Sequence, residues 1–288
     1  MPALLAFVVT CKGRLHHLQQ SLPGLVHQPN TECIVVDFDC PDRTCEWVSE
    51  NYPGVRIVHV TDTPRFHLSR ARNLGARAAT APRLCFVDAD VVVDEAFATT
   101  VIPELAEDCY FIIPHMAAGC DFRPSPLPWG AFGTAICARD DFRRIGGYDE
   151  AIEGWGGEDE DLYYRLGQAG VRLAMFPGQW LRAISHDDVE RTAHYEIRDR
   201  WLNHRIATLY LHVKYDLGRQ LGSNALSLES RQRIFHEIRD TLVRDARRGA
   251  TGSSFEVTLP DRIEVSVQAG WTINRRWVYG LAPQPQRS

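Results

Sequence analysis

The stretch Leu84-Cys85-Phe86-Val87-Asp88-Ala89-Asp90 decides the fold of this chain. Four apolar residues in a row are typical of a buried strand, and two carboxylates follow this run at once. Acidic side chains at the carboxyl end of such a strand lie where open α/β sheets bind their ligands. The stretch therefore predicts an α/β fold with a ligand site at this edge of the sheet.

The residues before this stretch repeat the alternation of strand and helix. Short apolar runs at 4–9, 33–36 and 55–60 alternate with one helical pattern that ends near residue 26 and another at about 69–79. Such alternation is typical of βαβ units that build a parallel sheet. Further along, we expect a helix with Asp140 as its N-cap that stops at Gly146-Gly147.

The pattern changes beyond about residue 190. Helical spacing at 202–217 and again at 234–242 predicts two amphipathic helices. Two alternating segments, 255–259 and 263–267, flank Pro260-Asp261 and predict a β-hairpin that turns there. We therefore expect an α/β domain over residues 1–190 and a mostly helical extension over residues 191–288 that ends in a hairpin.

Composition excludes several classes of protein. With 44% hydrophobic and 10% aromatic residues in 288, the chain can bury a full core, which argues against disorder. The 32 basic and 37 acidic residues give a formal charge of −5 without a basic run, which argues against nucleic-acid binding. No signal peptide or apolar run of about 20 residues is present. The eight cysteines form no C-x-x-C pair, so we expect reduced thiols and a cytoplasmic protein.

The strongest local signal is the run Gly154-Trp155-Gly156-Gly157-Glu158-Asp159-Glu160-Asp161. Four carboxylates follow two glycines that open a predicted helix, and the helix dipole stabilises acids there. A capped helix with a solvated first turn is the plain alternative. Adjacent glycines such as Gly156 let the backbone approach a ligand, and Trp155 offers a flat face for a sugar ring. We expect at least one of the carboxylates to be functional.

Asp88 and Asp90 offer the oxygen ligands that Mg²⁺ and Mn²⁺ prefer. A D-x-D pair alone is a weak signal, but its place directly after a buried strand favours a metal site. His186 follows the last apolar segment of the α/β part, and a lone histidine among eleven is more often structural. Its position relative to the acidic motifs makes it a candidate ligand.

Polar residues after the first two strands could bind a nucleotide base or diphosphate. Thr10 and Arg14 follow the first strand, and Asp37 follows the second. Arg72, on the helix at 69–79, could pair with a diphosphate or face solvent. Ordinary loop polarity is the alternative for the strand-end residues.

Taken together, these pieces resemble the glycosyltransferases of the GT-A fold, specifically family 2 and the related β-1,4-galactosyltransferases and chondroitin-polymerase-type enzymes. The resemblance covers about residues 4–188. It rests on the strand with Thr10 to Arg14, Ile34-Val35-Val36-Asp37, Arg72-Asn73-Leu74-Gly75, Asp88-Ala89-Asp90, Ile145-Gly146-Gly147-Tyr148-Asp149-Glu150 and the Trp-Gly-Gly-Glu-Asp block.

The resemblance implies a GT-A, Rossmann-like domain that binds a nucleotide sugar and Mn²⁺ or Mg²⁺. Asp88 would lie by the donor ribose and the metal, Asp90 would coordinate the metal, and His186 would complete its site. Arg14 and Asp37 look like uridine contacts.

In such an enzyme Asp159 would be the general base, and Glu158 or Asp161 would hold hydroxyls of the sugar or acceptor. The expected activity is metal-dependent, inverting transfer from a UDP-sugar to a hydroxyl of a glycan, small metabolite or peptide. One alternative is a retaining enzyme like the mucin-type GalNAc-transferases, which typically have Asn where this chain has Asp159. A non-catalytic nucleotide- or glycan-binding module and a nucleotidyltransferase are further alternatives. The C-terminal extension would pack on the catalytic domain, wall the acceptor site or form a homodimer interface.

Overall fold

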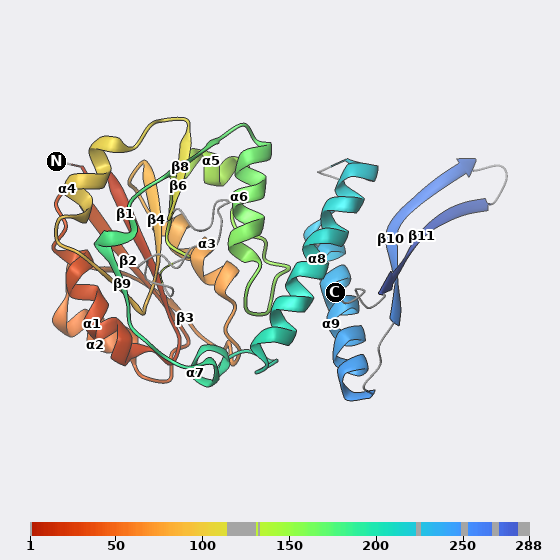
Figure 1. Cartoon of the computed structure of the whole chain (residues 1–288), viewed down its shortest axis with the longest axis horizontal. Coiled ribbons are helices and arrows are strands. Elements are labelled where there is room, and N and C mark those ends of the chain that lie inside the picture. The colour runs from red at the N-terminus through yellow and green to blue at the C-terminus, as the bar shows by residue number, and fades with distance from the viewer. Residues whose placement is uncertain are drawn as a thin grey trace, which may run out of the picture. The chain divides into compact units, whose positions relative to one another are not determined.

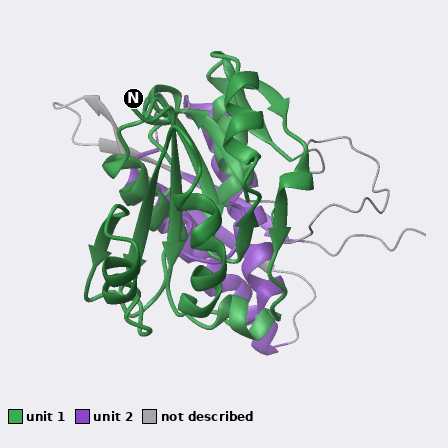
Figure 2. Ribbon diagram, turned by 90° about the vertical axis from the view of Figure 1, so that its left-hand side faces the viewer, with its two compact units in different colours: residues 1–149, 158–198 green, residues 150–157, 199–288 purple. Residues whose placement is uncertain are grey.

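The computed structural model describes residues 2–113, 131, 133–222, 226–248, 253–266 and 271–281. Backbone contacts divide the chain into two compact units, one of residues 1–149 and 158–198 and one of residues 150–157 and 199–288 (Figure 2). The loop between 154 and 157 thus groups with the second unit, while the carboxylates directly after it group with the first. The domain boundary that we expect at residue 190 stays a prediction.

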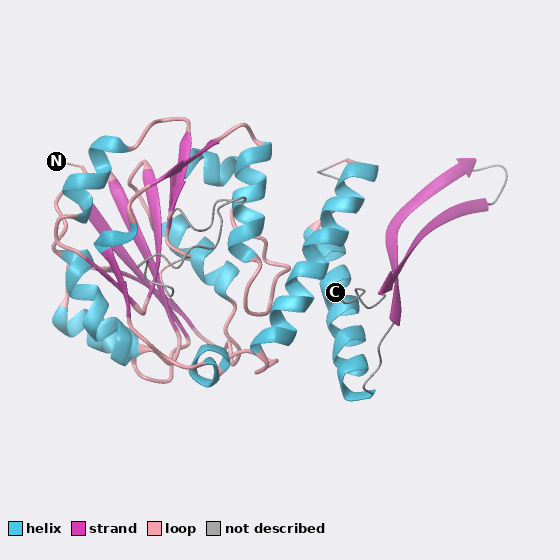
Figure 3. Ribbon diagram, viewed as in Figure 1, coloured by secondary structure: helices cyan, strands magenta, loops and turns pink. Residues whose placement is uncertain are grey.

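The first unit is built on a mostly parallel sheet, as the sequence predicts (Figure 3). Strands β1, β2, β3 and β4 are parallel, whereas β7 runs antiparallel to its neighbours β4 and β6. The order across the sheet is β3-β2-β1-β4-β7-β6-β8. The strands are β1 (Leu5–Cys11), β2 (Thr31–Phe38), β3 (Arg56–Val60), β4 (Arg83–Asp88), β6 (Cys109–Ile112), β7 (Ala135–Ala138) and β8 (Arg172–Met175).

Helices cover both faces of this sheet (Figure 1). Because side chains alternate along a strand, β1 sends Phe7 into a core with Leu18 of α1, and Val8 into a second core with Ala71 of α3. This three-layer arrangement explains why the strands read as continuous apolar runs. The helices of this unit are α1 (Leu15–Val26), α2 (Thr44–Asn51), α3 (Leu68–Ala78), α4 (Phe97–Val101), α5 (Arg139–Arg144), α6 (Glu158–Gln168) and α7 (Asp188–Thr192).

A small separate sheet joins two distant segments of the first unit. Strand β5 (Val91–Val93) pairs antiparallel with β9 (Leu181–Ala183). One further backbone hydrogen bond extends this pairing, because the N–H of Ile184 donates to the carbonyl of Asp90 at 2.7 Å. The segment that carries His186 is thereby fixed next to the end of β4.

The start of α5 differs from the prediction. Asp140 lies in the first turn of the helix, and Ala138, with φ −65° and ψ 136°, is the N-cap. The reason is that β7 runs directly into α5, so the backbone changes conformation at the last strand residue. At α6 the prediction is confirmed, since Gly156 and Gly157 precede it with φ of +88° and +85°, values that favour glycine.

The second unit consists of two helices and a hairpin. Both predicted helices are confirmed as α8 (Arg200–Leu221) and α9 (Leu228–Arg248). The hairpin is confirmed, but its predicted turn is wrong: β10 (Ser253–Ser266) runs through Pro260 and pairs with β11 (Trp271–Leu281). The register shifts between Thr258 and Arg262, and such an irregularity tolerates a proline, which has no N–H to donate.

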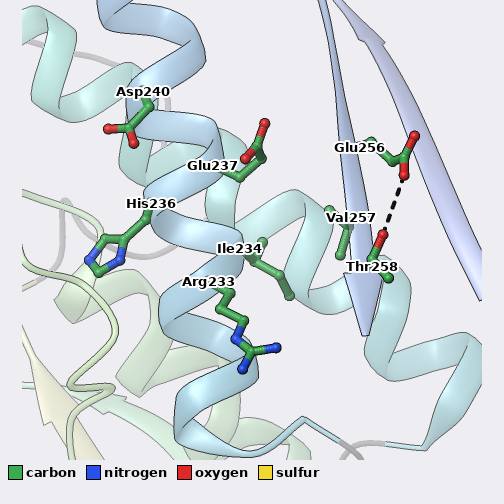
Figure 4. Close-up of a pocket in the computed structure, with 8 residues that line it drawn as sticks. All are labelled: Arg233, Ile234, His236, Glu237, Asp240, Glu256, Val257 and Thr258. Carbon is green, nitrogen blue, oxygen red and sulfur yellow. Dashed lines mark hydrogen bonds between the residues drawn. The ribbon is translucent and has the colours of Figure 1, made fainter. Parts of the chain in front are cut away.

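A pocket of about 380 Å³ lies between α9 and β10 within this unit. Figure 4 shows Ile234 directed toward β10 and His236 directed away from it. None of the site residues predicted from the sequence lines this pocket. Of the helices in the described part of the chain, none is both long and apolar enough to cross a membrane.

Gly75 tests how closely α3 packs on the sheet. A Cβ at this position would lie 2.4 Å from Cγ1 of Val8. We expect Gly75→Ala to destabilise the chain by about 1–3 kcal/mol in urea unfolding, because the helix must move off the sheet. The control is Gly167→Ala in α6, where nothing lies within 4 Å of the added Cβ and where the substitution should not destabilise. Equal stability of the two variants would contradict the close packing.

Candidate active site

The carboxyl ends of β1, β2 and β4 meet at one edge of the sheet. The chain moves outward from β1 to β2 and β3, then returns to place β4 on the other side of β1, which makes a topological switch point between β1 and β4. Thr10 lies in register with Asp88 across this point, and Cys11 lies in register with Asp37 on the neighbouring strand. Three of the predicted site residues therefore gather where open α/β sheets bind ligands.

Arg72 of α3 is the centre of a buried ionic cluster at this edge. Its side chain is 2% exposed and donates to Asp159 at 2.7 Å, to Asp88 at 2.9 Å and to Glu158 at 3.4 Å. The three carboxylates come from β4 and from the first turn of α6. Both terminal nitrogens of Arg72 are thus engaged by protein carboxylates, a third arrangement beside the diphosphate contact and the solvent-facing side chain that the sequence leaves open.

One guanidinium cannot neutralise three carboxylates. Burial, together with the charge of Asp159, raises the pKa of Glu158. Burial likewise raises the pKa of Asp159 to about 6, against the opposing effect of Arg72. Oε2 of Glu158 is buried and has no hydrogen-bond partner. The site therefore holds carboxyl groups that can exchange protons near neutral pH.

Two further residues complete the cluster, and the sequence does not single them out as site residues. The Tyr148 hydroxyl donates to Oδ1 of Asp159 at 3.4 Å, and the Arg72 guanidinium lies 5.0 Å from the centre of the Tyr148 ring. A Cβ at Gly133 would lie 3.1 Å from Arg72 and also from Oδ2 of both Asp88 and Asp159. A side chain here would require these three neighbours to shift by a few tenths of an ångström.

Asn73 holds Tyr148 in place. Its amide nitrogen donates to the Tyr148 carbonyl at 2.9 Å, and its amide oxygen accepts the Tyr148 N–H at 2.8 Å. This paired contact fixes the Gly-Gly-Tyr segment on α3. It gives a physical reason why the Arg72-Asn73 and Gly147-Tyr148 motifs occur together.

Asp90, His186 and Arg14 form a second group. Nε2 of His186 lies 2.5 Å from Oδ2 of Asp90, and Arg14 donates to the same oxygen at 3.0 Å. Although burial opposes it, the pKa of Asp90 is lowered by its hydrogen bond with His186 and by the charge of Arg14. Asp90 is therefore ionised at neutral pH and can attract a cation.

This group fits part of a divalent-metal site. A carboxylate oxygen and an imidazole nitrogen face each other, and both suit Mn²⁺, which completes its shell with phosphate oxygens and water. Asp88 is turned to Arg72 instead. The ligand atoms of Asp88, Asp90 and His186 do not all lie within 4.8 Å of one another. The structure thus brings together two of the three predicted ligands.

The remaining predicted residues have other partners. Both carboxylate oxygens of Asp37 accept backbone N–H groups, from Cys40 at 2.8 Å and Cys45 at 2.7 Å, so Asp37 orders the loop into α2. Trp155, next to Gly156, belongs to the second unit, where the Arg200 guanidinium lies 4.8 Å from the centre of its ring. A nucleotide contact of Asp37 and a sugar contact of Trp155 stay predictions.

The chain has the fold of the GT-A glycosyltransferases. Among solved structures, a mannosyltransferase from Pyrobaculum calidifontis in complex with GDP-Man and Mn²⁺ is similar over 87% of this chain and 77% of its own, with a TM-score of 0.53 and 16% identity. TarS from S. aureus is similar over 83% of this chain and 43% of its own, with a TM-score of 0.54 and 13% identity.

Sequence comparison identifies the family. The chain belongs to glycosyl transferase family 2, whose model matches residues 6–149, half of the chain. The N-terminal domain of galactosyltransferase matches residues 114–195. These matches cover all the acidic motifs described above.

Two curated relatives illustrate the range of similar proteins. Validoxylamine A glucosyltransferase of Streptomyces hygroscopicus subsp. jinggangensis is 26% identical over 69% of this chain and 59% of its own length. Polypeptide N-acetylgalactosaminyltransferase 3 of Homo sapiens is 26% identical over 49% of this chain and 29% of its own. The chain thus spans just over half the length of the glucosyltransferase.

Replacement of Arg72 tests the ionic cluster. We expect Arg72→Met to cost about 3–5 kcal/mol in urea unfolding at pH 8, because three carboxylates lose their counter-charge. The loss should shrink at pH 5, since the buried carboxyl groups then bind protons that the unfolded chain does not. The control is Arg43→Met, which removes an exposed pair with Glu46 and should change stability by about 0.5 kcal/mol or less. A loss that does not depend on pH would contradict the shared counter-charge.

Proposed function

We propose that this glycosyltransferase moves a sugar from a UDP-sugar to a hydroxyl group, with a divalent cation at the donor and inversion at the anomeric carbon. The proposal rests on the environment of Asp159. Its carboxylate is only 13% exposed, with a pKa raised to about 6, and it shares Arg72 with Asp88 at the ligand edge of the sheet. Such a group accepts a proton at neutral pH, which is what an attacking hydroxyl requires.

We propose roles for the residues of the cluster around Asp159. Asp159 takes the proton of the acceptor hydroxyl as its oxygen attacks the anomeric carbon on the face opposite the diphosphate, and a single displacement inverts that carbon. Arg72 and Tyr148 hold Asp159 at 2.7 Å and 3.4 Å, so we assign them positioning roles. Glu158, with its raised pKa, offers a proton for a hydrogen bond to a sugar or acceptor hydroxyl.

Asp90 and His186 are the residues that would hold the cation, Mn²⁺ or Mg²⁺. When bound, the cation neutralises the charge that develops on the departing diphosphate. Arg14 adds a positive charge at the same oxygen of Asp90. With the cation bound, the cation and Arg14 would supply positive charge beside Asp90, where the diphosphate would depart.

The donor would lie across the switch point between β1 and β4. Thr10, Arg14 and Asp37 would face the nucleoside, and Asp88 would face the ribose. Thr10, Asp37 and Asp88 lie at the carboxyl ends of β1, β2 and β4, and Arg14 follows β1. TarS has a solved complex with UDP-GlcNAc, with a TM-score of 0.50 to this chain, and the mannosyltransferase binds GDP-Man. We propose UDP as the nucleotide, and any test must include GDP.

The assignment of Asp159 as the general base predicts the effect of replacing it. We expect Asp159→Asn to lower kcat by about 10²–10⁴-fold while the variant stays folded and still binds the nucleotide. Glu160→Gln is the matched control, because Glu160 is its exposed neighbour on α6, and this variant should keep its activity. An undiminished rate in Asp159→Asn would exclude this residue as the base. Retention of the anomeric configuration, read by NMR of the product, would exclude inversion.

The same residue should set the acid side of the pH profile. Because the base must be deprotonated and its pKa is about 6, kcat/KM should rise about tenfold per pH unit below pH 6 and level off above it. Measurement of kcat/KM from pH 4.5 to 8 checks this expectation. A flat profile across pH 6 would contradict it.

The donor site can be tested without an acceptor. A thermal-shift panel of UDP, GDP and CDP with and without Mn²⁺ should show a rise in Tm with UDP that requires the metal. A ligand at 100 times its Kd adds about 2.7 kcal/mol of stability. The shift should vanish in Asp90→Ala and persist in Asp94→Ala, a change at an exposed acid shortly after it. A shift with GDP alone would overturn UDP as the donor nucleotide, and a shift that needs no metal would overturn the metal.

A further inference from the structure

Three metal-ligating atoms meet at the first turn of α1, outside the groups described so far. His16 and His17 belong to α1, and Glu190 belongs to α7. One nitrogen of each ring and one oxygen of the carboxylate all lie within 4.8 Å of one another. Sugar transfer as proposed above gives these residues no part.

The distances fit a tetrahedral cation. Nε2 of His16 lies 3.2 Å and Nδ1 of His17 lies 3.4 Å from the same oxygen, Oε1 of Glu190. Zn²⁺ binds nitrogen and carboxylate oxygen at about 2.0–2.2 Å, so neighbouring ligands on a tetrahedron lie about 3.3–3.5 Å apart. The two nitrogen–oxygen distances, 3.2 Å and 3.4 Å, are close to those of ligand pairs around one zinc ion.

Hydrogen bonding does not account for these contacts. Nδ1 of His17 and Oε1 of Glu190 are both buried, and neither has a hydrogen-bond partner of suitable direction. The His17 residue is only 3% exposed, so water does not readily satisfy its ring. A bound cation would satisfy both orphaned atoms at once.

We propose that His16, His17 and Glu190 form a second metal site, which takes Zn²⁺ and is distinct from the donor cation site. Two imidazoles and one carboxylate suit Zn²⁺, whereas Mn²⁺ and Mg²⁺ prefer oxygen-rich shells. The His16 side chain is 58% exposed, which leaves a path from solvent and room for a water as fourth ligand.

The site would act on the segment that carries His186. A zinc ion would tie the first turn of α1 to α7, which begins two residues after His186. The ring of His17 lies 5.6 Å from that of His186, so the two centres are neighbours. Zinc would thus stabilise the position of a donor-site residue without touching the donor.

The test measures zinc affinity in an Asp90→Ala background, so that the donor site does not contribute. Competition with a chromophoric chelator should show one Zn²⁺ per chain. Adding His16→Ala or Glu190→Gln should raise the Kd by about 100-fold or more, since even outer partners of a metal contribute 10–100-fold. His27→Ala is the matched control, because His27 is the C-cap of the same helix and bonds only locally to Pro23.

A second readout excludes a merely structural effect. Zn²⁺ should raise the Tm of the His27→Ala chain and leave that of the His16→Ala chain unchanged. Both variants should fold, because His16 is exposed. If Asp90→Ala does not fold, His186→Ala provides the same background. The proposal is overturned if His16→Ala, Glu190→Gln and His27→Ala bind zinc equally well. It is also overturned if the Asp90→Ala chain binds no zinc.

Discussion

The architecture of the site depends on one buried guanidinium. Arg72 is 2% exposed and forms ion pairs with carboxylates from two other elements, β4 and α6. Burial of an ion pair is itself not stabilising unless every charge has a partner. Here three carboxylates share the Arg72 guanidinium, so the cluster has an excess of negative charge. The surrounding fold must therefore hold these side chains close together. The Asn73–Tyr148 contact and the close approach of Gly133 supply that constraint.

Contacts between distant segments complete what the parallel sheet begins. His186 reaches Asp90, 96 positions earlier in the chain, because β9 pairs with β5 and the pairing extends to Ile184. Neither strand is long, with three residues each. Short strands of this kind are stabilised by their surroundings and not by their own propensity. A small antiparallel pair thus determines where an imidazole lies relative to the main sheet.

The sequence predicts those parts of the site that end a strongly patterned element. Asp88 follows a continuous apolar run, so local pattern identifies it. Asp159 is one of four carboxylates that follow two glycines, and only the family resemblance singles it out among them. Tyr148 and Gly133 are missed because their roles come from tertiary contacts that no period encodes. The same reason explains the misplaced hairpin turn: alternation through Pro260 is equally consistent with one long strand, and only pairing with β11 decides between them.

Asp88 and Asp90 are separated by one residue but belong to different electrostatic groups. Strand β4 ends at Asp88, which faces Arg72, while the chain turns and delivers Asp90 to His186 and Arg14. The two groups therefore differ in pKa. Burial raises the pKa of Asp159, which shares Arg72 with Asp88, whereas a hydrogen bond and a positive charge lower the pKa of Asp90. Environments that push neighbouring acids apart in this way separate a proton acceptor from a permanent anion. The proposed proton acceptor, Asp159 on α6, and the proposed cation ligand, Asp90 after β4, therefore have different charged partners and do not compete for the same charge.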